Sequence, residues 1–301
     1  MYKRFLPVQG RRGSAELVAD RQKSGKGIPM KTKVLAIINQ KGGVGKTTSC
    51  INIGACMAKA GKKVLIIDMD PQGNATTGLG IKKHVEFVNE LGKKDVRPVL
   101  NIYTVLSGNT DVLNKELIRQ TEVENLELIP ASIDLSAIEM EMNDYPNREK
   151  VLVKAIEPLM GKYDYILLDC PPSMSLITIN SMVAATSVLI PVQCEFYAME
   201  GLAQLLDSIN IIRKFLNPKL TVYHVLLTMY SGRYKLHHQV AEEIEKYFGK
   251  RLLETRIPVN VRLAEAPSFG KPIILYDKRS TGALAYMRAT EELLMRESKR
   301  K

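Results

Sequence analysis

A short glycine-rich run near residue 40 constrains the fold of this chain more than any other stretch. The run, QKGGVGKTT at 40–48, follows an apolar, largely β-branched segment at 34–38 and precedes a helical pattern at 49–60. Such a loop between a strand and a helix lets successive backbone N–H groups converge on phosphate oxygens, and the helix N-terminus adds positive potential. The run therefore predicts a cradle for a nucleoside triphosphate, completed by a lysine and a hydroxyl.

The run departs from the general phosphate-loop pattern G-x-x-x-x-G-K-[ST], because Gln40 stands where the first glycine belongs. It contains instead a second lysine, Lys41, five residues before the phosphate lysine Lys46. Two ammonium groups this close on a tight loop would crowd one triphosphate tail. We therefore expect Lys41 to reach elsewhere.

Apolar runs of buried-strand type alternate with amphipathic helical patterns along the rest of the chain. We expect strands at 34–38, 63–68, 126–130, 165–169, 187–192, 222–229 and 252–257, and helices at 49–60, 103–106, 135–142, 150–160, 201–215, 236–248 and 281–296. Strands that alternate with helices are joined by right-handed crossovers into parallel sheets. The sequence therefore predicts an α/β fold with a doubly wound, mainly parallel sheet and helices on both faces.

The chain of 301 residues, 45% of them hydrophobic, is long enough to bury a sizeable core. We expect residues 30–301 to form a single domain, with a loop at 69–80 and an exposed, lysine-rich excursion at 82–99. Residues 1–29 show no sustained periodicity and predict a mobile extension. Two alternatives stay open for this extension: a basic arm that touches DNA, or a stretch that lies before a native start at Met30.

Charge narrows the class of partner. The formal net charge is +11, and residues 1–29 hold seven Lys or Arg against two acids, which leaves +6 for the rest. A balance this basic attracts polyanions, of which nucleic acid is the commonest in a cytoplasm. No run approaches the roughly 20 apolar residues of a membrane span, and no signal-peptide pattern opens the chain. We therefore expect a cytoplasmic protein.

The cysteines are scattered and form no C-x-x-C pair. Free cysteine is commonly a small buried apolar residue. The spacing argues against structural disulfides or zinc and predicts four buried thiols, at Cys50, Cys56, Cys170 and Cys194.

Three acids end or follow the apolar strand runs. Asp169 ends YILLD ahead of Cys-Pro-Pro-Ser, Asp68 ends KVLIID, and Asp70 lies two residues later in a flexible loop. Ligands bind outside the carboxyl ends of strands in open α/β sheets, so we expect these acids to face the phosphate loop. Thr47 and Asp169 are the predicted Mg²⁺ ligands, and Asp70 is free to approach a γ-phosphate and orient a water.

Six motifs together resemble the ParA/Soj family of DNA-partitioning ATPases, which belongs to the deviant Walker A group. They are QKGGVGKTT, DMDPQGNATTGLG, YDYILLDCPPS, IPVQCEFYAMEGL, LLTMYSGR and IPVNVRLAEAPSFGKPIILYD, and the resemblance runs from about residue 33 to about residue 296. It implies a fold of the P-loop NTPase type, with ATP and Mg²⁺ as cofactors. It also implies slow intrinsic ATP hydrolysis that a partner stimulates.

The resemblance implies a role for each site residue. Lys46 would bind the β- and γ-phosphates in its own subunit, and Lys41 would reach the partner's nucleotide across an ATP sandwich homodimer. Asp70 would position the hydrolytic water, while Thr47 and Asp169 would handle magnesium. The backbone amides that would cradle phosphate belong to Gly42, Gly43, Val44, Gly45, Lys46, Thr47 and Thr48.

In this family the ATP-bound homodimer binds double-stranded DNA without sequence preference, and a ParB-type centromere-binding protein stimulates hydrolysis and releases it. The resemblance thus implies a nucleoid-associated protein. Arg233 and Arg262 match DNA-contacting arginines of the family. Further candidates are Lys271, Arg279 and the basic tail 299–301. Phosphate contacts of this kind are salt-sensitive and blind to sequence.

Two other ATPase classes stay open. A membrane-surface positioning ATPase of the MinD type needs a terminal amphipathic helix with bulky apolar anchors, and residues 291–301 offer only Leu293, Leu294 and Met295. We therefore expect no stable membrane association. An iron–sulfur ATPase of the nitrogenase-reductase type needs cysteines that bridge a dimer, whereas Cys170 directly follows Asp169.

Overall fold

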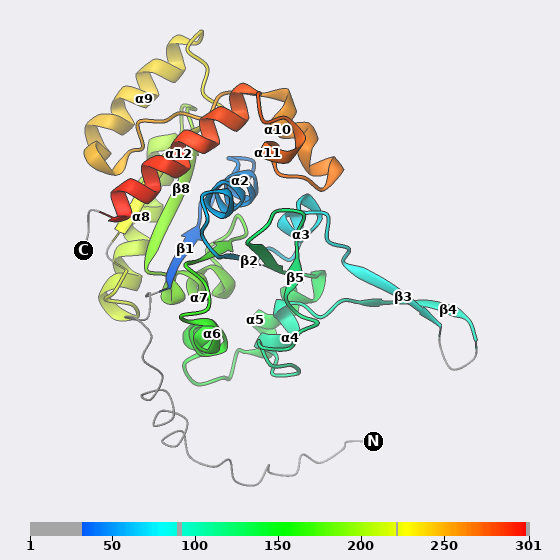
Figure 1. The fold of residues 1–301 in the computed structure, drawn as a ribbon. Helices are drawn as coiled ribbons and strands as arrows, with labels where there is room; N and C mark the ends of the chain where they lie inside the picture. Colours follow the sequence, from blue (N-terminus) through cyan, green and yellow to red (C-terminus); the bar gives the residue numbers. More distant parts are fainter. Residues whose placement is uncertain (1–31, 89–91, 221, 299–301) are drawn as a thin grey trace, which may run out of the picture. The chain divides into compact units, whose positions relative to one another are not determined.

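The computed structural model describes residues 32–88, 92–220 and 222–298 (Figure 1). The extension expected at 1–29 and the basic tail 299–301 lie outside the described residues. Among the described residues, no helix is both long enough and apolar enough to cross a membrane.

Seven strands form the central sheet, in the order β5-β6-β2-β7-β1-β8-β9. Every strand pair in this sheet is parallel except β5 with β6 at one edge. The strands are β1 (Lys33–Ile37), β2 (Val64–Asp68), β5 (Arg119–Gln120), β6 (Leu126–Ile129), β7 (Tyr165–Asp169), β8 (Ser187–Gln193) and β9 (Val222–Thr228). The prediction of a mainly parallel sheet is confirmed.

Helices cover both faces of this sheet and enclose two hydrophobic cores (Figure 1). Val34 and Ala36 of β1 lie in one core, and Leu35 and Ile37 lie in the other, as the alternation of side chains along a strand requires. The first core includes α4 (Ile102–Leu106), α5 (Ile138–Glu141), α6 (Val151–Ile156), α7 (Leu176–Ala184), α8 (Ala198–Phe215) and α9 (Lys235–Phe248). The second includes α2 (Lys46–Lys59), α3 (Asn74–Gly78), α10 (Val261–Glu265), α11 (Ile273–Tyr276) and α12 (Thr281–Ser298).

The long helices begin and end within a few residues of their predicted bounds, and the shorter ones differ more. The helix expected at 135–142 is a 3₁₀ turn, Ile133–Ala137, followed by α5. The helix expected at 150–160 divides into two 3₁₀ turns, Arg148–Lys150 and Glu157–Leu159, on either side of α6. The predicted loop at 69–80 contains α3, which sequence analysis did not predict.

The strand expected at 252–257 is wrong. This segment meets β9 through one isolated bridge, between Leu252 and Val225, and through two backbone hydrogen bonds, from the N–H groups of Leu253 and Ile257 to carbonyls of β9. The N–H groups of Glu254 and Thr255 donate to the carboxylate of Glu292 on α12, at 2.8 and 3.1 Å, rather than to a strand. A side chain on α12 thus takes the place of ladder partners, and β9 remains the edge of the sheet.

The described residues of the excursion expected at 82–99 are exposed, except the half-buried Lys83 and the buried Val99, and they have regular structure. They form an antiparallel hairpin of β3 (His84–Val88) and β4 (Lys94–Pro98), in which every residue is exposed. The four cysteines are all buried and free, as predicted.

Helix α2 approaches the sheet closely at Gly54. A Cβ at this position would lie 2.9 Å from Cδ1 of Ile66 on β2 and 3.1 Å from Cδ1 of Leu167 on β7. Real Cβ atoms rarely come this close to a neighbour, so the missing side chain lets α2 rest directly on two strands. This close packing fixes the height of α2, and therefore of the loop before it, above the sheet.

Gly54→Ala should lower the free energy of unfolding by about 1–3 kcal/mol, because overpacking against two strands outweighs the gain in helix propensity. Gly201→Ala on α8 is the matched control, since a Cβ there meets nothing within 4 Å and should stabilise by about 0.5–1 kcal/mol. Denaturant unfolding measures both variants. Equal effects at the two positions would contradict the close approach of α2.

Candidate phosphate-binding site

The loop between β1 and α2 takes its shape from two glycines in the left-handed region. Gly43 has φ 75° and Gly45 has φ 85°, values that residues with a side chain rarely adopt. The carbonyl of Val44 accepts a hydrogen bond of 2.8 Å from the hydroxyl of Thr228, the last residue of β9. The loop that follows β1 is therefore held at the end of β9, two strands away in the sheet.

Helix α2 starts directly after the loop, and Gly45 caps it without a side-chain acceptor. The first N–H groups of any α-helix have no partner inside the helix, and they carry the positive end of its dipole. In a helix of 14 residues that opens on a glycine loop, these groups form a site for an anion. The predicted cradle, residues 42–48, lies at this helix start.

Lys46 crosses the loop from the first position of α2. Its side chain is buried, and Nζ donates a hydrogen bond of 2.9 Å to the carbonyl of Lys41. Burial lowers the pKa of Lys46, while the negative charges of Asp169 and Asp70 oppose that shift. An ammonium that is both buried and close to two acids gains more from an added anion than a solvated one does.

Asp68 and Asp169 end adjacent parallel strands and lie in register with each other. Both are fully buried. Oδ2 of Asp68 accepts hydrogen bonds from the N–H and the hydroxyl of Thr76 on α3, at 2.8 and 2.7 Å. Burial raises the pKa of Asp68 to about 6, although the two bonds from Thr76 act in the opposite direction.

The carboxylate of Asp169 is the unsatisfied group of the site. Both of its oxygens are buried and make no hydrogen bond of normal geometry to the described residues. Burial first, and then the charge of Asp68, raise the pKa of Asp169 well above its usual value, and the nearby Thr47 hydroxyl and Lys46 ammonium lower it. Buried polar atoms rarely lack a partner. An orphaned carboxylate close to a hydroxyl offers the oxygen ligands that Mg²⁺ prefers, so Thr47 and Asp169 fit this ion.

Asp70 completes the cluster of acids. Its carboxylate is buried, and Oδ1 accepts a hydrogen bond of 2.9 Å from the N–H of Gln72. Its own N–H donates to Oδ1 of Asp68 at 3.2 Å. The sequence predicted a free residue in a flexible loop, but the structure holds Asp70 by hydrogen bonds at a position where it acts on the charge of Lys46.

Lys41 points to a different neighbour. Its Nζ forms an ion pair with Oε2 of Glu195, just after β8, and both side chains are partly exposed. Its N–H donates to Oδ1 of Asn39 at 3.0 Å. The side chains of the two lysines therefore point to different partners, as we expected from the repulsion between two close ammonium groups. Glu195 was not predicted, although a carboxylate two residues beyond a strand at this sheet edge was the available signal.

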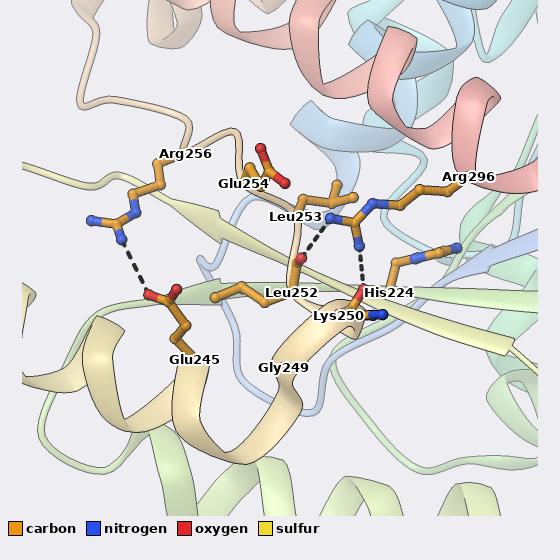
Figure 2. Close-up of a pocket in the computed structure, with 9 residues that line it drawn as sticks. All are labelled: His224, Glu245, Gly249, Lys250, Leu252, Leu253, Glu254, Arg256 and Arg296. Atoms are coloured by element: carbon orange, nitrogen blue, oxygen red, sulfur yellow. Dashed lines mark hydrogen bonds and ion pairs between the residues drawn. The ribbon is translucent and has the colours of Figure 1, made fainter.

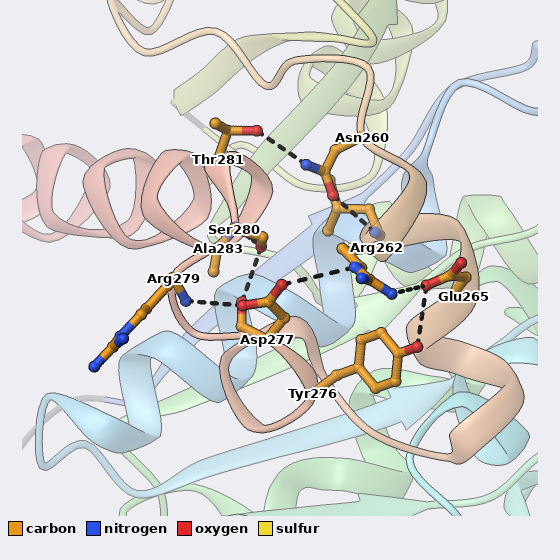
Figure 3. A network of polar contacts seen from close by, with 10 residues as sticks. Asn260, Arg262, Glu265, Tyr276, Asp277, Arg279, Ser280, Thr281 and Ala283 are labelled. Carbon is orange, nitrogen blue, oxygen red and sulfur yellow. Dashed lines mark hydrogen bonds and ion pairs between the residues drawn. The ribbon is translucent and has the colours of Figure 1, made fainter.

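The two candidate DNA-contacting arginines differ in their surroundings. Arg233 is exposed in the turn between β9 and α9. Arg262, on α10, pairs with Glu265 at 2.9 Å and with Asp277 at 3.8 Å (Figure 3). Of the further candidates, Lys271 pairs with Glu122 at 3.3 Å. Arg233 is thus the more accessible of the two arginines, because acids already occupy Arg262.

A cavity of about 660 Å³ lies elsewhere, between α9, the segment 249–256 and α12 (Figure 2). Arg296 donates to the carbonyls of Lys250 and Leu252, and Arg256 pairs with Glu245 at 3.8 Å. None of its lining residues belongs to the phosphate loop or to the three acids. The arginines are thus engaged in joining α12 and α9 to the segment beyond β9.

Asp169→Asn should stabilise the metal-free and nucleotide-free protein at pH 7.5. The pKa of Asp169 is raised in the folded state, so the folded protein holds more protons than the unfolded chain above the ordinary carboxyl pKa, and stability falls as the pH rises. The variant has no charge to bury, and its Tm should be higher by a few degrees, on the order of 2–6 °C.

The gain should shrink toward pH 4, where the wild-type carboxyl also becomes neutral. Asp207→Asn, at an exposed position on α8, is the control and should leave Tm unchanged. Thermal unfolding from pH 4 to pH 8 measures the difference. An Asp169→Asn variant that melts with the wild type at every pH would contradict an uncompensated buried charge.

Comparison with known proteins agrees with this geometry. The family model described as AAA domain matches residues 32–222, which is more than half of the chain. The sporulation initiation inhibitor protein Soj of Bacillus subtilis is 51% identical over 261 residues, which cover 87% of this chain and 98% of that protein. The chromosome partitioning protein ParA of Myxococcus xanthus is 47% identical over 266 residues, 88% of this chain and 89% of that protein.

A solved structure with a similar fold is cobyrinic acid a,c-diamide synthase from Mycobacterium smegmatis with bound ADP and magnesium. The TM-score is 0.73 and the sequence identity is 31%, and the match covers 90% of this chain and 97% of the synthase chain. The extent and identity of the two sequence matches show the family. The motifs quoted above lie within the matched length. This chain therefore belongs to the ParA/Soj family of chromosome-partitioning ATPases.

Proposed function

We propose that this protein is an ATPase that converts ATP and water to ADP and phosphate and uses an ATP-dependent homodimer to segregate DNA. The observation that carries the proposal is the division of the loop's two lysines. Lys46 lies buried among the acids at the sheet edge, while Lys41 leaves the site toward Glu195. One loop thus offers one cation to its own nucleotide and a second cation to another molecule.

Nucleotide binding follows from the position of Lys46. The amides of Gly42–Thr48 hold the phosphate oxygens, and Nζ of Lys46 exchanges the carbonyl of Lys41 for the β- and γ-phosphates. Thr47 and Asp169 hold Mg²⁺, which neutralises phosphate charge when bound. The synthase from Mycobacterium smegmatis, which carries ADP and magnesium, supports this assignment for the shared fold.

Hydrolysis needs a water in line with the γ-phosphate. Asp70 is the acid assigned to orient it, because the hydrogen bond from Gln72 fixes Oδ1 and leaves Oδ2 for the water. A positioned carboxylate that accepts a proton in the transition state typically contributes about 10²–10⁴ to a rate. The slow intrinsic rate expected of the family leaves room for a ParB-type centromere-binding protein to stimulate this step.

Dimerisation follows from the position of Lys41. The ion pair of Lys41 with Glu195 is partly exposed, with 45% and 43% of the side chains accessible, and exposed pairs of this kind contribute about 0–1 kcal/mol. Lys41 therefore gives up little stability when it exchanges Glu195 for the triphosphate of a partner subunit. ATP occupancy then controls pairing, because ADP offers no γ-phosphate to the incoming lysine.

The paired form binds double-stranded DNA without sequence preference and so associates with the nucleoid. The net charge of +11 favours a polyanion, and two copies bring two sets of arginines to one duplex. Arg233 is the principal contact, and Arg262 contributes once DNA phosphate competes with Glu265 and Asp277. Hydrolysis separates the subunits and releases the DNA.

Two substitutions should separate the steps. Asp70→Ala should form a dimer with ATP and hydrolyse it at least about 100-fold more slowly, so that the protein stays on DNA.

Lys41→Ala should bind ATP as a monomer, because the substitution removes only the ammonium that reaches across the dimer. Light scattering and phosphate release measure both, with Asp207→Ala as an exposed control. Normal turnover in Asp70→Ala, or a normal dimer in Lys41→Ala, would refute these roles.

Arg233→Glu should weaken binding of the ATP-analogue-bound protein to duplex DNA. It should also reduce the slope of log affinity against log salt by about one for each DNA phosphate that the arginine neutralises. Arg213→Glu on α8 carries the same change of charge at another exposed position and is the control. Fluorescence anisotropy between 50 and about 200 mM salt gives both slopes. Equal weakening in the two variants would indicate a general effect of net charge instead of a phosphate contact at Arg233.

A further inference from the structure

The turn that carries Arg233 is held by two histidines from the start of α9. The N–H of Ser231 lies 3.0 Å from Nδ1 of His237. Nε2 of His238 lies 2.9 Å from the carbonyl of Gly232, and its Nδ1 lies 3.2 Å from the hydroxyl of Tyr230. Three polar contacts thus fasten two consecutive residues of the turn, and the tyrosine before them, to one end of a helix.

Donor and acceptor chemistry fixes the tautomer of each ring. A backbone N–H can only donate, so Nδ1 of His237 is an unprotonated acceptor. A carbonyl can only accept, so Nε2 of His238 carries the proton, and its Nδ1 accepts from the hydroxyl of Tyr230. The two histidines therefore play opposite parts: His237 accepts from the turn and His238 donates to it.

Aromatic packing supports these hydrogen bonds. The ring of Tyr230 lies 6.0 Å from that of His237 and 5.8 Å from that of His238, centroid to centroid. The guanidinium of Arg256 lies 4.6 Å from the centroid of the Tyr230 ring, and the ring of Tyr234 lies 5.1 Å from that of His237. The N–H of Tyr230 also donates to the carbonyl of Ile257 at 2.9 Å. The residues on either side of the turn are thus fixed by rings as well as by hydrogen bonds.

We propose that His237 and His238 are positioning residues that hold the 231–233 turn in the conformation in which Arg233 meets a DNA phosphate. This inference rests on the proposed DNA-binding function. An exposed turn that contains Gly232 would otherwise sample many conformations, and ordering it on binding would cost conformational entropy. The histidines order the turn beforehand, which raises the affinity without touching DNA.

The test compares truncated and isosteric variants. His237→Ala removes the acceptor, whereas His237→Asn places an amide oxygen near the position of Nδ1. His238→Ala removes the donor, whereas His238→Gln places an amide NH₂ near the position of Nε2. We expect each alanine variant to bind duplex DNA about 2- to 12-fold more weakly, the equivalent of one hydrogen bond, and each amide variant to recover most of that affinity.

The measurement is anisotropy of a labelled DNA duplex with full-length protein saturated by a non-hydrolysable ATP analogue. The affinity for the analogue should be unchanged in all four variants, because the hydrogen bonds of these two histidines go to the turn and to Tyr230. Rescue by the amides separates a positioning role from bulk packing, since asparagine and glutamine do not replace the imidazole ring.

A double-mutant cycle with Arg233→Ala decides the outcome. In that background the histidine substitutions should have no further effect on DNA affinity, because the residue they position is gone. Histidine effects that persist there would overturn the positioning role. Normal binding by the alanine variants, with weak binding by Arg233→Ala, would overturn it and leave the proposed function intact. Normal binding by Arg233→Ala would reject the DNA contact itself and the positioning role with it.

Discussion

The rest of the site depends on two carboxylates buried side by side. Asp68 and Asp169 end adjacent parallel strands in register, and burial raises the pKa of each. Two such charges oppose one another unless a cation joins them. Thr76 satisfies Asp68, whereas Asp169 keeps both oxygens without a hydrogen-bond partner among the described residues. The carboxylate without hydrogen-bond partners is therefore the one next to the phosphate loop, where a bound divalent ion would neutralise its charge.

The phosphate loop places positive potential next to the negative charge of these acids. The unpaired N–H groups at the start of α2 and the buried ammonium of Lys46 lie at the same sheet edge as the acids. Burying the acids together costs free energy, and so does burying the ammonium of Lys46. A magnesium–nucleotide complex would offer a cation to the acids and phosphate oxygens to Lys46 and the helix N–H groups. Lys41 lies outside this balance, because its ammonium pairs with Glu195 beyond β8.

The sequence predicted the parts of the molecule that local pattern determines. The glycine loop, the strand-terminal acids and the parting of the two lysines follow from residues close together in the chain, and the structure agrees. Other features depend on distant partners. Glu292 accepts from the N–H groups of the expected strand at 252–257 from 37 and 38 residues away. Asp277, beyond α11, shares Arg262 with Glu265 of the same helix. Polar and apolar residues alternate along β3, which was a signal for a strand of the hairpin. The many lysines on either side made the whole stretch look like a polar loop.

The phosphate loop and the turn that carries Arg233 are joined through the end of one strand, β9. Thr228 ends β9 and donates to the carbonyl of Val44 in the phosphate loop. The next residue, Met229, has φ 49°, a conformation that side chains other than glycine rarely adopt, and it turns the chain into the segment that carries Arg233. One strand end therefore meets the phosphate loop on one side and the exposed turn on the other.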